Sequence, residues 1–229
     1  MLVSADVGST LRVAVTASNV AGSSAATSAQ TAAVVRNPPV NTTAPAISGT
    51  ARDGQTLTAS SGTWSGTPPI SFAYQWRRCD GGGANCVDLA GANGSAYVVV
   101  SADVGSTLRV IVTGSNLAGS SVATSAQTVV VVGNPPVNTG VPMVSGSAQV
   151  GQTLSADPGT WSGTLPISFA YQWRRCDGAG ANCVDLIPMN GQSYTLTSGD
   201  LGATIRLAVT ASNSGGSSSP LKYATASER

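Results

Sequence analysis

Apolar and polar residues alternate along several short runs of the chain. The clearest is SFAYQW (71–76), where aromatic residues occupy every second position. A period of two is typical of a strand with one buried and one solvated face. By this criterion we expect strands over residues 55–59, 70–79, 86–89, 96–100, 107–116 and 123–132. Helical periodicity is absent, and Gly- and Pro-rich turns separate the runs, so the pattern predicts an all-β sandwich or barrel.

The pattern recurs at a fixed interval. Residues 62–89 and 159–186 both read GTWSGTxPISFAYQWRRCDGxGANCVDL, identical at 26 of 28 positions and offset by 97 residues. SADVGSTLRV (4–13) recurs unchanged 97 residues later, and returns a third time as SGDLGATIRL (198–207). We therefore expect one β-sandwich over 37–133, a second over 134–229, and in residues 1–36 the last strands of a truncated module.

Proline marks the joints between these modules. RNPPVNTTAP (36–45) and GNPPVNTGVP (133–142) cannot be helical, and their prolines lack a backbone donor. They are predicted to be short, extended linkers of limited flexibility.

The candidate core combines aliphatic and aromatic residues. On their strands, Leu57 and Ala59 are expected to face inward, as are Leu108, Val110 and Val112. Phe72, Tyr74 and Trp76 share one face and are also assigned to the interior. The aromatic core residues proposed for the two repeats are Trp64, Tyr74, Trp76, Trp161, Tyr171 and Trp173. Trp64 lies beside a turn, so a sugar-stacking role is an alternative there, although burial is favoured.

A D-x-G turn precedes the long strand of each repeat. It places Asp103 before Gly105 and Asp200 before Gly202. We expect the Asp carboxylates to accept backbone N–H bonds within these turns.

The four cysteines allow three pairings. Cys79–Cys86 and Cys176–Cys183 are each seven residues apart across a predicted hairpin, and the repeat reproduces them, so local disulfides are favoured. A zinc site would need four ligands, and the chain has no His to add to two Cys per repeat. A redox role would favour C-x-x-C spacing. Structural disulfides indicate an oxidising compartment, hence a secreted or cell-surface location.

Composition narrows the functional classes. Only 9% of residues are charged and the net charge is +1, which argues against a nucleic-acid partner. No apolar run is long enough for membrane insertion. The absence of His excludes Ser–His and Cys–His nucleophile systems. Asp80, Asp88 and Asp103 could form an acid–base pair, but turn roles are favoured, and the linkers lack the carboxylates that calcium prefers. We expect no cofactor, no metal and no enzymatic activity.

The motifs YQWRRCD…C, SADVGSTLRVxVT and SNxAGSS, in this order and at this period, resemble the tandem immunoglobulin-like repeats of bacterial secreted and surface proteins. The resemblance implies a stalk, spacer or adhesion module. Two features depart from antibody domains: no Cys lies on the strands that would carry an inter-sheet disulfide, and the D-x-G turn leads to Thr107 and Leu108 rather than to Tyr.

The leading functional hypothesis is a non-catalytic structural spacer or stalk. The alternative is an adhesion or carbohydrate-binding module with repeated sites, whose glycan or protein ligand the sequence does not identify. The expected partners are other immunoglobulin-like repeats of the same or a neighbouring chain. Residues 1–36 are either loosely packed strands of a fragment or strands donated head-to-tail to the last sandwich of a neighbouring chain, which would build a filament.

Overall fold

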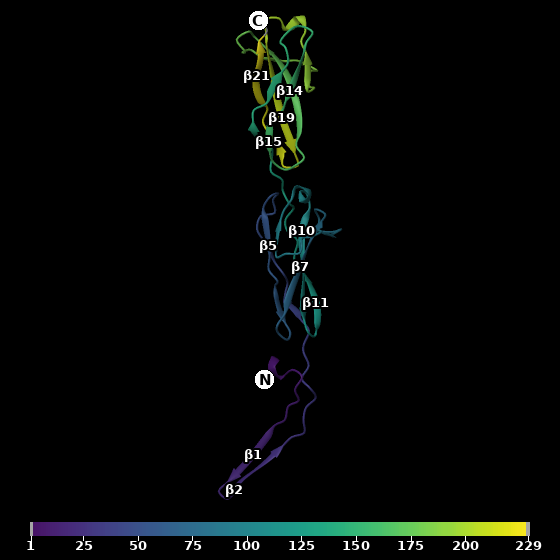
Figure 1. Cartoon of the computed structure of the whole chain (residues 1–229), viewed down its shortest axis with the longest axis vertical. Helices are drawn as coiled ribbons and strands as arrows, with labels where there is room; N and C mark the ends of the chain where they lie inside the picture. Colours follow the sequence, from purple (N-terminus) through teal and green to yellow (C-terminus); the bar gives the residue numbers. More distant parts are fainter. Residues whose placement is uncertain (1, 228–229) are drawn as a thin grey trace. The chain divides into compact units, whose positions relative to one another are not determined.

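A computed structural model describes residues 2–227, and their side chains as far as residue 220. The chain forms two compact units. The first comprises residues 1–49, 56–97 and 107–129, and the second comprises residues 50–55, 98–106 and 130–229. The described elements are β-strands and three short 3₁₀ helices (Figure 1). The chain is therefore all-β, as the alternating pattern predicts.

The strands of the first repeat follow a short N-terminal hairpin of β1 (Ala14–Asn19) and β2 (Gly22–Thr27). They are β3 (Val40–Thr43), β4 (Ile47–Ser48), β5 (Thr56–Ala59), β6 (Thr63–Ser65), β7 (Ser71–Cys79), β8 (Val87–Asp88), β9 (Ala96–Val98), β10 (Thr107–Asn116) and β11 (Gly119–Thr124).

The second repeat has nine strands equivalent to these in the same order, followed by one further strand, β21. They are β12 (Val137–Gly140), β13 (Met143–Ser145), β14 (Thr153–Asp157), β15 (Thr160–Ser162), β16 (Ser168–Cys176), β17 (Val184–Asp185), β18 (Ser193–Thr195), β19 (Thr204–Asn213), β20 (Gly216–Ser217) and β21 (Leu221–Ser227).

Two main sheets recur in each repeat. In the first repeat the strand orders are β8-β7-β10-β11 and β4-β5-β9. In the second they are β17-β16-β19-β20 and β13-β14-β18. In sequence order these strands follow the immunoglobulin scheme, in which strands A, B and E form one sheet while C, F and G form the other. The fold is thus an immunoglobulin-like sandwich, and its strand order is now defined.

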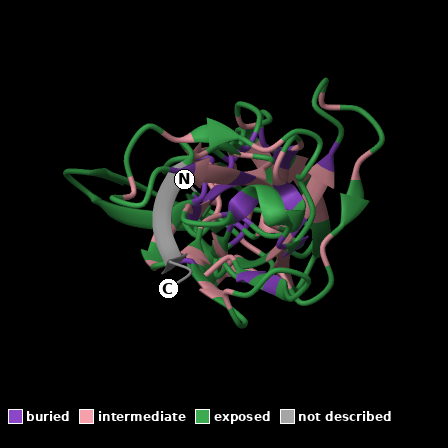
Figure 2. Ribbon diagram, turned by 90° about the horizontal axis from the view of Figure 1, so that it is seen from above, coloured by how far each residue is buried: buried purple, intermediate pink, exposed green. Residues whose placement is uncertain are grey.

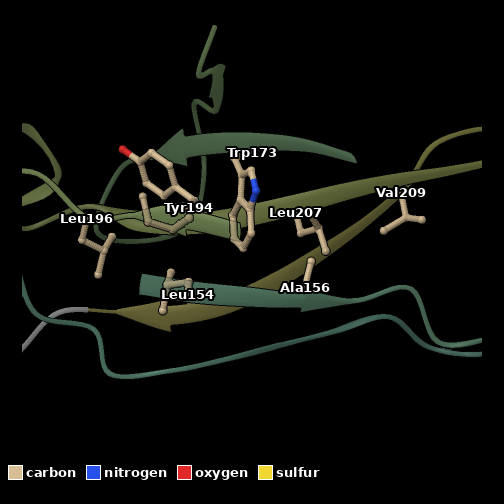
Figure 3. Packing of buried hydrophobic residues seen from close by; sticks show 8 residues of the cluster. Leu154, Ala156, Trp173, Tyr194, Leu196, Leu207 and Val209 are labelled. Atoms are coloured by element: carbon tan, nitrogen blue, oxygen red, sulfur yellow. The ribbon is translucent and has the colours of Figure 1, made fainter. Parts of the chain in front are cut away.

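The core of the second unit lies between its two sheets. One cluster joins Leu154 and Ala156 of β14 to Trp173 of β16 and to Leu207 and Val209 of β19. In Figure 3 these side chains point toward one another, with Trp173 in the middle of the group. Figure 2 shows the buried residues near the centre of the view with exposed residues around them. The predicted inward faces are confirmed, since Leu57, Leu108, Val110 and Val112 are at most 1% exposed.

The aromatic strand is buried unevenly. Trp76 is fully buried and Tyr74 is half-buried, but Phe72 is 38% exposed, so the prediction of an inward Phe72 is wrong. β7 pairs along its whole length with β10, from Thr107 opposite Cys79 to Ser115 opposite Ser71. Phe72 lies near the end of this ladder, where it contacts the ring of Trp64 instead of the core centre.

Two further sequence predictions need correction. The closing strand expected over 123–132 lies at β11, residues 119–124. Beyond it the backbone bonds to β10 irregularly, through Ser125 N to Val110 O and Thr128 N to Leu108 O. The Pro-rich joints are extended but are more than spacers, because β3 pairs with β6 and β12 with β15. Their polar residues gave no alternating signal, so these strands were missed.

The last strand of the chain also pairs internally. β21 lies antiparallel to β19, with Leu221 opposite Val209 and Ala224 opposite Arg206. Head-to-tail donation would need a vacant position beside β19, and β21 occupies that position.

We expect Trp173→Ala to lower the free energy of unfolding of the second unit by about 3–5 kcal/mol, because it empties a fully buried aromatic site. Chemical denaturation measures this. Trp161→Ala is the matched control and should cost less, since that indole is only half-buried. A near-neutral Trp173→Ala would contradict the core assignment.

Candidate functional site

A buried carboxylate organises the turn before the long strand of the second repeat. Asp200 is 2% exposed. One of its oxygens accepts from Arg175 Nε at 2.7 Å, and the other accepts from Tyr194 Oη at 2.8 Å and Thr197 N at 2.8 Å. Because β16, β18 and the turn each contribute a donor, the charge ties the two sheets to this turn.

The first repeat places Asp103 in the same position. Asp103 is fully buried and accepts from Val100 N at 2.9 Å, as the turn prediction required. Gly105 and Gly202 follow these aspartates with φ of 85° and 69°, a left-handed conformation that suits glycine.

Hydrogen bonding outweighs burial in setting the charge of Asp200. Burial alone raises the pKa of this carboxyl, but the donors from Thr197, Tyr194 and Arg175 together hold its pKa below the ordinary value. Burial, followed by the hydrogen bond to Asp200, raises the pKa of Tyr194. The cluster is thus built to keep Asp200 ionised, which suits a structural anchor.

Disulfides join Cys79 to Cys86 and Cys176 to Cys183, the predicted pairing. Each closes the hairpin loop that follows the aromatic strand. In the second loop Asp177 accepts from Ala181 N at 2.7 Å and Asn182 Nδ2 at 2.8 Å. These bonds, led by that of Ala181, lower the pKa of Asp177, and Asp80 shows the same shift in the first loop with Ala84 as the leading donor. The carboxylates therefore shape loops, as predicted.

The remaining carboxylate of each hairpin forms an ion pair on the sheet surface. Arg77 Nε lies 2.7 Å from Asp88 Oδ1, and Arg174 Nε lies 2.6 Å from Asp185 Oδ1. Both pairs are partly exposed, so each contributes little stability, about 0–1 kcal/mol.

An aromatic pair recurs at the edge of each core. The ring centroids of Trp64 and Phe72 are 5.7 Å apart, and those of Trp161 and Phe169 are 5.9 Å apart. Each indole N–H is satisfied locally, by Ser61 O and Pro158 O. Trp161, Phe169 and Tyr171 pack against the main core cluster, so these residues extend the core more than they offer a platform.

A shallow groove of about 330 Å³ lies on the outer face of the β16–β19 sheet. Gln172 and Arg174 line it from β16, Ala208 and Thr210 from β19, and Asp185 from β17. It is a candidate site for a small ligand on the second repeat. Ile111 occupies the position of Ala208 in the first repeat, so the two repeats differ here.

Two findings bear on other site types. Within residues 2–227, no group of three or more His, Cys, Asp or Glu side chains is arranged to hold a metal ion. The described part of the chain also contains no helix long and apolar enough to cross a membrane.

The sequence did not single out two members of the buried cluster, Tyr194 and Arg175. The repeat could have identified them, because Tyr97 and Arg78 lie at the equivalent positions 97 residues earlier. The missing Tyr at the start of β19 is compensated by Tyr194 on β18, whose hydroxyl reaches the turn from the other sheet.

No protein-family model matches the chain, and no curated protein matches it. Among solved structures, a variant of titin domains I67–I69 covers 94% of this chain and 73% of its own length, at 17% identity and a TM-score of 0.33. The four N-terminal immunoglobulin domains of Dscam1 isoform 7.44 cover 88% of this chain and 50% of their own length, at 14% identity and a TM-score of 0.34. Identities and TM-scores this low do not support a fold assignment by themselves. The assignment therefore depends on the strand order of this chain.

We expect Asp200→Asn to destabilise the second unit by about 3 kcal/mol, because an amide cannot accept every hydrogen bond that the carboxylate receives. The pKa of Asp200 is lower in the folded than in the unfolded state, so its charge stabilises the fold above about pH 4 and this contribution is lost as the pH falls. Denaturation between about pH 2 and 7 should therefore show a shallower acid slope in the variant.

Asp185→Asn is the matched control for Asp200→Asn. It breaks an exposed pair and should cost at most about 1 kcal/mol. Equal acid slopes in wild type and Asp200→Asn would show that Asp200 is not the acid-sensitive anchor.

Proposed function

We propose that the chain is a non-catalytic spacer built of immunoglobulin-like modules, over residues 37–133 and 134–229, within a secreted or cell-surface protein of bacterial type. Residues 1–36 carry the last strands of a further module of the same type. A spacer needs modules of fixed length that stay folded independently of any ligand.

One observation carries this proposal: the second repeat rebuilds the stabilising features of the first. Trp173 repeats Trp76, each donating its indole N–H to a glycine carbonyl at 2.9 Å. The disulfide hairpin and the buried Asp turn recur in the same way. The features that the two repeats share are those that stabilise the folded module. A spacer requires modules that are stable in this way.

The recurring carboxylates support a non-catalytic role. Asp80 holds the hairpin loop, Asp88 pairs with Arg77, and Asp103 is buried in its turn. Each thus has a structural partner in place of a substrate. The two disulfides support an oxidising compartment, because such bonds persist outside the cytosol.

Pulling on single molecules tests the spacer function. We expect discrete unfolding events, each lengthening the chain by about 30 nm, because about 90 residues per repeat extend beyond the disulfide-closed loop. Reduction of the disulfides should lengthen each step by about 2 nm. Smooth extension without discrete unfolding events would contradict a spacer whose modules resist mechanical force.

An adhesion module is the second candidate, favoured by the groove on the outer face of the second repeat. For a spacer we expect no retention on a glycan array. If the chain is retained instead, and Arg174→Ala abolishes this retention while Arg77→Ala does not, the groove binds glycan. That result would favour adhesion over the spacer function.

A further inference from the structure

Each repeat contains one asparagine that is followed directly by glycine. These pairs are Asn93 with Gly94, in the loop before β9, and Asn190 with Gly191, in the equivalent loop before β18. All four residues are exposed. Because glycine has no Cβ, its backbone nitrogen can approach the side-chain carbonyl carbon of the preceding residue closely. Each loop therefore places a nucleophilic nitrogen beside an electrophilic amide.

The groups that would react are not engaged elsewhere in the structure. Within residues 2–227, the side-chain amides of Asn93 and Asn190 make no hydrogen bond to protein, and neither do the backbone N–H groups of Gly94 and Gly191. The nitrogen can therefore leave its present position without breaking a protein hydrogen bond.

Asn116, in the same module as Asn93, shows the opposite arrangement. Its Nδ2 donates to Asn37 O and to Thr67 O, both at 2.8 Å, and its Oδ1 accepts from Ala118 N at 2.8 Å. It is followed by leucine, whose side chain hinders approach of the backbone nitrogen. Asn116 is thus an internal control for the reactivity of Asn93.

The main chain on both sides of Asn93 is bound to one buried side chain and its backbone. Ala92 O accepts from Trp76 N at 2.9 Å, and Gly94 O accepts from Trp76 Nε1 at 2.9 Å. Trp76 is fully buried, so its two donors are fixed in position. The length of main chain between the two carbonyls must match the spacing of these donors.

Asn190 lies between the same two contacts in the second repeat. Met189 O accepts from Trp173 N at 3.2 Å, and Gly191 O accepts from Trp173 Nε1 at 2.9 Å. Any change in the main chain at Asn190 therefore acts on the tryptophan at the centre of that core.

We propose that Asn93 and Asn190 are deamidation sites of the folded protein, and that isoaspartate at either position releases the buried tryptophan of its repeat. The backbone nitrogen of the glycine attacks the side-chain carbonyl carbon of the asparagine. The side-chain nitrogen takes up the amide proton of the glycine and leaves as ammonia, which gives a five-membered cyclic imide. Water then opens the ring, adding OH to one carbonyl carbon and H to the ring nitrogen.

The carbonyl at which water adds decides the structural outcome. Addition at the former side-chain carbon gives Asp, with the main chain unchanged in length. Addition at the backbone carbon gives isoaspartate, whose main chain runs through Cβ and contains an extra atom. The longer loop no longer matches the two donors of Trp76 or Trp173, and a buried indole N–H without an acceptor is costly. This inference does not depend on the spacer function.

The full chain with both disulfides formed is incubated for several weeks at mildly alkaline pH, because ring closure requires loss of the glycine amide proton. Isoaspartate is located by peptide mass spectrometry and quantified by enzymatic methylation of isoaspartyl carboxylates. We expect it to accumulate at Asn93 and Asn190 and not at Asn116. Chemical denaturation should show an unfolding midpoint that moves to lower denaturant in proportion to the isoaspartate content.

Gly94→Ala combined with Gly191→Ala is the matched variant. A Cβ at Gly94 would lie 3.5 Å from Ala96 O, and one at Gly191 would lie 3.7 Å from Ser193 O, both ordinary contacts at positions without left-handed φ. The fold therefore accepts both methyl groups. They hinder ring closure, so we expect both asparagines to stay unmodified over the same period and the unfolding midpoint to stay constant.

A second variant separates the new charge from the longer main chain. Asn93→Asp combined with Asn190→Asp carries the charge of the deamidated protein on a main chain of normal length. When freshly prepared, it should unfold at the midpoint of the unmodified wild type.

Three results would overturn the proposal. If the folded chain forms no isoaspartate at Asn93 or Asn190 while the urea-unfolded chain does, the fold prevents ring closure. If Gly94→Ala with Gly191→Ala deamidates as fast as wild type, the glycine nitrogen is not the nucleophile. If isoaspartate accumulates without any shift of the unfolding midpoint, the tryptophan contacts survive the longer main chain.

Discussion

Each sandwich depends on the burial of one tryptophan between its sheets. Trp173 is fully buried and touches residues of both sheets, and its indole N–H donates to Gly191 O at 2.9 Å. A chain with only 5% aromatic residues has few side chains large enough to fill the space between two sheets. The smaller residues around Trp173, such as Ala156 and Val209, are sufficient only because that indole is present.

The buried aspartate solves a different problem, the attachment of a turn to the sandwich. Apolar packing does not specify how a turn sits, whereas Asp200 fixes its turn through donors from both sheets. Such a charge is stable in the interior because every donor is directed at it, and removing one donor leaves a poorly satisfied charge. Arg175 and Tyr194 are therefore as much part of the turn as the residues between Ser198 and Gly202.

The sequence was a good guide where a feature is local and repeated. Alternation identified β7 and β10, and Cys spacing identified the hairpin disulfides, because both signals lie within a few residues. Strands β3 and β6 were missed, since their pairing joins short polar segments whose side chains carry no period of two. The Asp200 cluster was found only in part, because Arg175 and Tyr194 reach the turn from strands that sequence alone does not place beside it.

The two copies of VSADVGSTLRV show that a sequence pattern alone does not determine which residues are buried. Residues 3–13 and 100–110 have the same alternation and the same propensities, yet Val110 is fully buried while Val13 is 59% exposed. A pattern of apolar residues states which face a strand could bury, and the burial itself requires a partner of matching register. For residues 100–110 that partner lies in the preceding strands of the same repeat.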